Sequence, residues 1–521
     1  MEAVVIAPGA GLIAGRRPAR ATRPIVVAAL ATLAFVAGPG ERRAGAQGNP
    51  LPKASRAPSQ IVLPRDNARP TKPTKLGPRP DPAPTSPPPA PVLPPVSKTT
   101  EAPRYQIRNE AGESTVARLH GERNGRALLI QPDGQLGIPS VLVPTKEPFV
   151  PIQADELRRR LEDGPYAGFQ VLTTPHYLIF YKSRLAFAQD SAKLLEELYR
   201  GLLDFCRRHD LPAHDSEFPL VAVIFATERD FRAHKQVDPE VQAYYEIFTN
   251  RIFFYDQSER DKNEPRLVTL RKPQTVAHEG THQILANIGI QPRRAEWPLW
   301  LIEGFAEYCA TPTRTKKGFV FDRLGAINAL HMATLRELDD PLSMGRPDGE
   351  KGAEGASHSA RLIDSRALVL KEKLTPTDYA QSWALTLYLT QKHPKEFTRY
   401  LLVMGRMSPL EPRTPEDHLK EFREYFGQDL DRLDREAEDY LHKLMRRGNF
   451  PSIPYYAVIV EQPLGGGMLR RTAWISQSPQ MIQRWVEKTV SSGGGIYNWE
   501  AVPFPTRARA ELYAENWIRG Y

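Results

Sequence analysis

Cysteine is scarce in this chain of 521 residues, which contains only Cys206 and Cys309. One bridge at most can form, so the fold is not that of a small disulfide-stapled scaffold. Both cysteines lie in apolar patterns of helical spacing, and two interpretations stay open: a pair of buried free thiols or a single bridge. An apolar content of 41% is enough instead for at least one sizeable core.

Long apolar runs are also lacking, and the one that stands out is too short to cross a bilayer comfortably. Residues 25–37 are apolar, four arginines precede them, and Ala44-Gly45-Ala46 offers a small-x-small cleavage site. This order is typical of a secretory signal peptide, which we place at residues 1–46. It predicts an exported protein, periplasmic, cell-envelope or secreted, and an uncleaved membrane anchor is the alternative.

An excess of one charge sign is lacking from most of the chain, although the formal net charge is +9. Residues 1–105 hold 15 Lys/Arg and 5 Asp/Glu, which leaves 55 and 56 for the remainder. A nucleic-acid-binding surface needs a concentration of basic residues that this balanced remainder does not supply. The sequence therefore predicts no nucleic-acid partner.

Proline, in contrast, is abundant in residues 47–105, which hold 17 of the 49 prolines and almost no large apolar side chains. Such a segment cannot bury enough surface to fold, so we expect a disordered, extended linker. Its scattered basic residues also allow contact with an anionic cell wall or envelope surface, whereas a solvated spacer is the simpler interpretation.

Two small modules are expected to flank a central domain at residues 166–450. Residues 106–165 contain short alternating stretches around a turn at Pro132-Asp133-Gly134, which predicts a small β module. Residues 451–521 predict a βαβ-like α/β accessory module, whose tryptophans we expect in its core rather than on a binding platform. Its elements are expected at residues 455–460 (strand), 472–475 (strand) and 479–488 (helix).

The central domain begins with a mixed pattern of strands and helices, which predicts an α+β fold. The expected elements are a strand-rich segment at 169–181, a helix at 185–208, a buried strand at 218–225, a short helix at 230–234 and a strand at 250–256. Within the last strand, residues 252–255 are expected to lie at a sheet edge. That edge is either an ordinary one or a place where an extended peptide binds as an additional strand.

The pentapeptide His278-Glu279-Gly280-Thr281-His282 follows that strand. Pro273 suits a first helical turn and Gly289 suits a C-terminal cap, so we expect a helix of about four turns between them. Residues four apart share one face of a helix. His278 and His282 can therefore reach one metal ion while Glu279 stands beside it as a base.

A second helix is expected between Pro298 and Pro312, and it carries Glu303 and Glu307. Two imidazoles and one carboxylate with an open position form the pattern of a catalytic zinc site, which makes Glu303 the third ligand. Glu307, one turn later, can accept the second ring N–H of a ligating histidine. The alternative is a pair of hydrogen-bonded core histidines beside a solvated helical face, but it requires four unrelated coincidences.

The residues after the motif discriminate between zinc families. A metzincin requires Gly at 285 and His at 288, where this chain has Leu285 and Ile288. With HE-x-T-H-Q followed by W-L-x-E-G-x-A-x-Y, the chain resembles gluzincins, in particular exported proteins with a peptidase-MA-like domain. The resemblance covers residues 166–444. The two zinc motifs are its specific part, and the segments 168–177 and 379–385 are softer signals.

The resemblance implies a zincin-like fold, a bound Zn²⁺ ion and a peptide or protein substrate. Glu279 would take a proton from water acidified by the metal and hand it to the leaving amine. Gluzincins usually place a Tyr or His near the developing oxyanion, and the Y-x-x-x-W pattern makes Tyr379 the candidate. The alternative for Tyr379 is a packed ring with a solvated hydroxyl, and His358, in a Gly-rich segment, is the fallback donor.

These observations together predict an exported, zinc-dependent metallopeptidase with Glu279 as general base. Two alternatives remain open at this point: a zinc amidase acting on cell-wall peptide, and a peptidase-like envelope protein that binds without catalysis. An intact Glu279 argues against the second, because a scaffold has no need of a general base.

Overall fold

A computed structural model describes residues 102–108, 114–139, 141–237, 241–258, 265–315, 318–321, 323–339, 361–448, 453–465, 468–478, 482, 485–486 and 498–519. The expected signal peptide, nearly all of the expected linker and His358 lie outside these residues. Within them, no helix is long and apolar enough to cross a membrane. The described chain mixes several sheets with many helices, which confirms the predicted α+β class.

The N-terminal module is a five-stranded antiparallel sheet of order β4-β3-β2-β1-β5, as the sequence predicted. Its strands are β1 (Arg104–Arg108), β2 (Ser114–Arg123), β3 (Arg126–Ile130), β4 (Leu136–Gly137) and β5 (Val143–Thr145). Asn124 and Gly125 both have positive φ, which suits the two-residue turn between β2 and β3. Helix α1 (Ala154–Glu162) follows the sheet.

The central sheet has the order β6-β7-β8-β10-β9. Its strands are β6 (Gln170–Thr173), β7 (Tyr177–Tyr181), β8 (Leu220–Thr227), β9 (Ala243–Glu246) and β10 (Arg251–Gln257). The middle strands β7, β8 and β10 run parallel, and β6 and β9 add antiparallel edges. The prediction that residues 252–255 form an edge is wrong. The turn at Asn250, with a φ of 59°, returns β10 beside β9, so β10 is paired on both sides.

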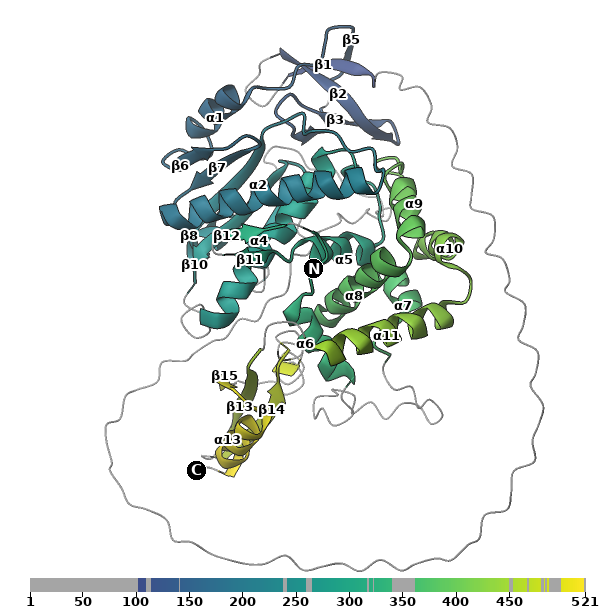
Figure 1. Cartoon of the computed structure of the whole chain (residues 1–521). Helices are drawn as coiled ribbons and strands as arrows, with labels where there is room; N and C mark the ends of the chain where they lie inside the picture. Colours follow the sequence, from purple (N-terminus) through teal and green to yellow (C-terminus); the bar gives the residue numbers. More distant parts are fainter. Residues whose placement is uncertain are drawn as a thin grey trace, which may run out of the picture. The chain divides into compact units, whose positions relative to one another are not determined.

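Helices cover both faces of this sheet, and side chains alternate between two cores because successive residues of a strand point to opposite faces. Ile179 and Ala222 pack with α2 (Leu185–Arg208) and the following helices. Phe180 and Val223 pack with α1 and α3 (Glu228–His234). Figure 1 shows α2 lying across the sheet. Helix α2 has the predicted bounds.

The motif helix α4 (Pro265–Asn287) begins earlier than predicted. Pro273 lies inside it and not in its first turn, so that boundary was wrong. The Lys272 side chain, which donates to the main-chain oxygen of Asp256, ties this part of α4 to the end of β10, so tertiary contact supports the helix ahead of the proline. The C-terminal boundary is confirmed. Gly289 has a φ of 83° two residues after the end, where a Cβ atom would lie 2.6 Å from the His214 ring.

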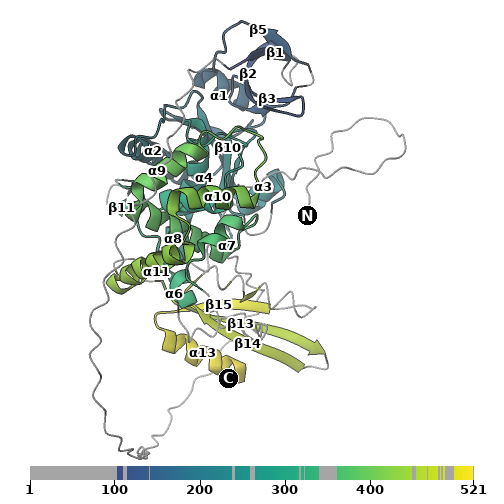
Figure 2. The ribbon, with the colours of Figure 1, turned by 90° about the vertical axis from the view of Figure 1, so that its right-hand side faces the viewer.

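Helix α5 (Leu299–Cys309) lies between Pro298 and Pro312 as predicted and packs closely on α8 (Pro376–Lys392). Gly304 permits this approach, because a Cβ atom there would lie 2.5 Å from the main-chain oxygen of Ser382. A helical region completes the core with α2, α4 and α5 (Figures 1 and 2). Its elements are β11 (Thr313–Thr315), β12 (Gly318–Val320), α6 (Ala329–Asp339), α7 (Ser365–Leu370), α8 (Pro376–Lys392), α9 (Pro394–Met404), α10 (Pro415–Phe426) and α11 (Leu430–Arg447).

The C-terminal module is a three-stranded antiparallel sheet of order β14-β13-β15, and the predicted βαβ-like arrangement stays a prediction because its helix lies mostly outside the described residues. Its elements are β13 (Tyr455–Gly465), β14 (Met468–Ser476), β15 (Asn498–Phe504) and α13 (Arg507–Arg519). The short connection between β13 and β14 can only form a hairpin, because a parallel pair needs a much longer crossover. The expected helix at 479–488 lies mostly outside the described residues. Trp474 is buried as expected.

Candidate metal centre

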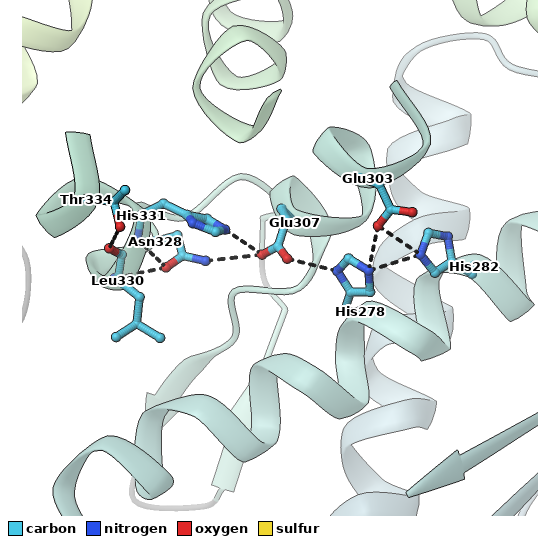
Figure 3. Close-up of polar contacts among 8 residues, drawn as sticks. All are labelled: His278, His282, Glu303, Glu307, Asn328, Leu330, His331 and Thr334. Carbon is cyan, nitrogen blue, oxygen red and sulfur yellow. Dashed lines mark hydrogen bonds and ion pairs between the residues drawn. The ribbon is translucent and has the colours of Figure 1, made fainter. Parts of the chain in front are cut away.

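The two motif histidines and Glu303 converge on one point between α4 and α5 (Figure 3). His278 Nε2 lies 3.0 Å from His282 Nε2 and 3.2 Å from Glu303 Oε2, and His282 Nε2 lies 3.8 Å from the same carboxylate oxygen. All three side chains are buried. The one-turn spacing on α4 sets the two rings side by side, and the packing of α5 on α4 supplies the carboxylate.

The polar atoms around His278 indicate that the point where His278, His282 and Glu303 meet suits a cation. Its Nδ1 lies 3.1 Å from Glu307 Oε1, and its Nε2 lies 3.2 Å from Glu303 Oε2. Burial opposes a charge on the ring, but the charges and hydrogen bonds of Glu307 and Glu303 outweigh burial and raise the pKa of His278, so this point favours a positive charge. When Nδ1 alone carries the ring proton, Nε2, His282 Nε2 and the Glu303 carboxylate are acceptors that face one another. A cation resolves this convergence of acceptors, and two imidazoles with one carboxylate are a donor set that suits zinc. The residues therefore fit the ion.

Glu307 is held in place from the opposite side by residues that the sequence did not single out. His331 Nε2, on α6, lies 2.8 Å from Glu307 Oε2, and the Asn328 side-chain amide donates to the same oxygen at 3.5 Å. Figure 3 shows the resulting row from His278 through Glu307 to His331. The only sequence signal for His331 is a polar residue within the apolar run of residues 329–335.

The Glu307 carboxylate is kept ionised by its two histidine neighbours. Burial alone would raise its pKa, but the charges and hydrogen bonds of His331 and His278 outweigh burial and lower the pKa to about 2. An ionised acceptor on Nδ1 fixes the tautomer and orientation of His278 and increases the basicity of its Nε2. Glu307 thus occupies the position that the sequence predicted for it.

Glu279 lies beside the metal-binding residues with one oxygen occupied and the other without a partner. Its Oε2 accepts the main-chain N–H of Tyr245 on β9 at 2.7 Å, and its Oε1 has no hydrogen-bond partner. Burial raises the pKa of Glu279 to about 7, with Glu303 acting in the same direction and the His278 charge opposing it. A carboxyl group with a pKa near neutrality is suited to accept and return a proton.

Tyr379, near the start of α8, lies at the same centre. Its hydroxyl hydrogen-bonds the Glu303 carboxylate. Burial, together with the charges of Glu303, Glu307 and Glu279, raises the pKa of Tyr379 well above its ordinary value, so the hydroxyl remains a proton donor. The alternative of a solvated hydroxyl is wrong, because the side chain is buried.

Residues 273–411 match the model of a family described as a protein of unknown function (DUF1570). The match contains all six predicted site residues: His278, Glu279, His282, Glu303, Glu307 and Tyr379. It leaves the N-terminal and C-terminal sheets outside. No curated protein matches the chain.

A small cavity of about 30 Å³ opens beside the centre on the His282 side. It lies between β9, α4, α5 and the loop from Gln291 to Ala295 that joins the two helices. His282 and Tyr245 line it, so a molecule in this space contacts both a metal-binding residue and the strand that binds Glu279. No motif or spacing in the sequence indicated this cavity.

Cys206 and Cys309 are both buried and unbridged, in keeping with one of the two open interpretations. Burial raises the pKa of the Cys206 thiol to about 12, which leaves it unreactive at neutral pH. Neither cysteine belongs to the centre.

Proposed function

We propose that the chain is a zinc-dependent hydrolase of the gluzincin type that cleaves peptide bonds. The observation that carries the proposal is the convergence of His278, His282 and Glu303 on one buried point with Glu279 beside them. A closed structural zinc site has four protein ligands, whereas three ligands leave one position for water or substrate. The small cavity beside His282 adjoins these residues and supports the approach of a ligand from that side.

Zinc, when bound by His278, His282 and Glu303, supplies Lewis acidity that polarises a substrate carbonyl and lowers the pKa of water. The remaining chemistry belongs to the protein. Glu279 Oε1, which has no hydrogen-bond partner, accepts a proton from the attacking water. The main-chain N–H of Tyr245 holds the other oxygen of Glu279 and so orients the base. The same carboxyl group then returns the proton to the leaving amine nitrogen.

Tyr379 is suited to a second role in this reaction. Its hydroxyl keeps its proton at all physiological pH values and lies at Glu303, one of the three metal-binding side chains. A donor at this place can stabilise negative charge that develops on the carbonyl oxygen, and such a donor contributes about 3 kcal/mol to catalysis in acyl-transfer enzymes. Tyr379 is therefore the donor we propose.

The test is a comparison of zinc content and peptide cleavage in the full chain and in the Glu279→Gln variant. Zinc per chain is measured by elemental analysis, and cleavage is measured with a broad peptide library. We expect about one zinc in both proteins and a loss of cleavage of about 10²- to 10⁴-fold in the variant. Glu411→Gln, at an exposed position, is the matched control and keeps both properties.

Two results would contradict the proposal. Wild-type protein that takes up no zinc when zinc is supplied rules out the metal centre. Zinc-loaded protein whose cleavage survives Glu279→Gln rules out Glu279 as the base. Cleavage of cell-wall peptides in place of protein peptides would leave the centre intact and change only the substrate.

A further inference from the structure

The cavity beside His282 has a charge that the proposed reaction does not explain. Arg293 and Arg294 both line it, and the ten residues that form its wall include no aspartate or glutamate. Apolar side chains such as Ile247 and Ile302 make up much of the rest. A concave, largely apolar pocket with two arginines in its lining has a positive potential where a substrate would enter.

Arg293 is buried and is held by neutral acceptors. Its guanidinium donates to the main-chain oxygen of Gly134 at 2.7 Å and to that of Ile247 at 3.3 Å, and it hydrogen-bonds the Tyr245 side chain. In the part of the chain that the structure describes, no carboxylate lies within ion-pair distance of it. Carbonyl oxygens satisfy the N–H groups but leave the net charge in place, and Asp133 acts on it electrostatically without forming an ion pair.

Arg294 is the more accessible of the two arginines, because its side chain is half-buried. Its guanidinium lies 5.6 Å from the centre of the Phe248 ring, a cation–π contact that orients the group without neutralising it. Glu296 acts on it electrostatically, but no ion pair joins the two residues. This second cation in the same cavity is therefore free to meet an anionic group.

The loop that carries both arginines is fixed from three sides. His120 of the N-terminal sheet contacts the main-chain oxygen of Arg293 at 2.7 Å. The Leu410 main-chain N–H donates to the main-chain oxygen of Arg294 at 3.0 Å. The Trp297 indole N–H donates to the main-chain oxygen of Met404 at 2.8 Å. The main chain of both arginines is thus held in place before any ligand arrives, which favours binding.

We propose that the cavity beside His282 binds a carboxylate group of the peptide substrate, with Arg294 as the contacting residue and Arg293 as the buried supporting charge. The inference rests on the proposed function, since it takes the ligand to be a peptide held at the metal centre. Two sources share this chemistry, an acidic side chain near the cleaved bond and a free C-terminal carboxylate. Arg294 is then a specificity-determining residue.

The test measures binding without turnover, in full-length protein that carries Glu279→Gln. Three peptide pools, alike at all other randomised positions, are equilibrated with the protein by dialysis, and the bound peptides are quantified by mass spectrometry. The first pool has a central Glu with acetylated and amidated ends, the second has Gln in its place, and the third has Gln and a free C-terminal carboxylate. We expect about tenfold tighter binding of the first or the third pool than of the second.

Substitutions at Arg294 then assign the preference to this residue. Arg294→Gln is expected to abolish the preference, Arg294→Lys to retain part of it, and Arg294→Glu to reverse it in favour of a pool with a central Lys. The control Arg207→Gln, which removes an exposed arginine on α2, leaves the preference unchanged. Zinc content and thermal unfolding of each variant show whether it is folded.

The outcomes separate this inference from the proposed function. Equal binding of all three pools, or a preference that survives Arg294→Gln in folded protein, overturns the inference even if the wild type cleaves peptides. A carboxylate preference that depends on Arg294 supports the inference even if the wild type cleaves none of the peptides tested, in which case only the proposed function fails. Where cleavage is observed, Arg294→Gln is also expected to raise KM about tenfold for the preferred pool.

Discussion

The two flanks of the metal centre differ in both packing and charge. On the His278 flank, Glu307 and His331 form a closed, buried row in which the carboxylate is matched by two rings. On the His282 flank there is open space, and the two arginines of the cavity face it without carboxylate partners in the described chain. The same pair of helices thus presents a paired acidic side and an unpaired basic side.

Under the proposed function, this difference separates the residues that hold a metal ion from the residues that admit a substrate. A closed flank fixes the orientation of a ligand, because the buried Glu307 carboxylate lies against both rings, 3.1 Å from His278 Nδ1 and 2.8 Å from His331 Nε2. An open flank with unpaired charge does not fix a ligand. It leaves space, and a positive electrostatic potential, for an incoming group. Substitutions that weaken one flank therefore test whether the other flank responds.

The largest effect is expected from Glu303→Ala, because Glu303 lies between the two flanks. It is the proposed third metal ligand, and it accepts a hydrogen bond from Tyr379. Loss of a residue that only orients a ligand costs about 10- to 100-fold in metal affinity, so loss of a direct ligand should cost more than about 100-fold. Competition with a chelator of known affinity measures the zinc dissociation constant. An unchanged constant would exclude Glu303 as a ligand.

Gly304→Ala is expected to disturb the closed flank by separating α5 from α8. Its Cβ would lie 2.5 Å from the Ser382 main-chain oxygen and 2.7 Å from Thr386 Oγ1. Alanine favours a helix by about 1 kcal/mol over glycine, but overpacking against main chain costs more, and we expect a net destabilisation of about 2 kcal/mol. Urea unfolding of zinc-free protein measures it. A stabilised variant would show that the two helices can move apart freely.

The sequence indicated which residues come together at the candidate centre because each relevant relation is local. His278, Glu279 and His282 lie within two turns of one helix, and Glu303 and Glu307 lie one turn apart on another. The bounds of α2 and α5 followed from apolar spacing and flanking prolines for the same reason. Where a local rule competed with tertiary contact, as at Pro273, the local rule failed.

The sequence could not reveal the relations that depend on distant segments. His331 reaches Glu307 only because α6 packs beside α5, and the Tyr245 N–H reaches Glu279 only because β9 pairs with β10. The cavity is formed by four elements, and the charge of Arg293 is unusual only once its burial is known. None of these features is accompanied by a periodic pattern or a short motif in the sequence.

Glu307→Gln is expected to weaken zinc binding more than His331→Gln does. The amide of Gln can still accept from His278 Nδ1, but without the negative charge that increases the basicity of the ring, so we expect a loss of about 10- to 100-fold in affinity. His331→Gln acts one step further away and should cost about tenfold or less. His442→Gln, at a partly exposed ion pair with Asp339, is the control. Equal losses in the two variants would argue against a stepwise row.

The smallest effect concerns the support of the open flank, where His120 contacts the main chain of Arg293. Burial lowers the pKa of His120 to about 4, with the nearby arginines acting in the same direction and the hydrogen bond to Arg293 opposing it. The folded protein therefore keeps this ring neutral while the unfolded chain takes up a proton below pH 6.5. Stability attached to His120 is complete above pH 6.5 and is lost as the pH falls toward 4.

His120→Gln should remove this pH dependence. At pH 5.5 the protonation of His120 in the unfolded chain favours unfolding by about 1 kcal/mol, so the stability of the variant should fall less between pH 7 and pH 5.5 by that amount. His418, whose pKa burial also lowers to about 4, keeps its own contribution in both proteins. Urea unfolding in the presence of a chelator measures the change apart from zinc loss. Parallel pH curves for the two proteins would mean that the ring is charged in the folded state, and the loop under Arg293 would then need another support.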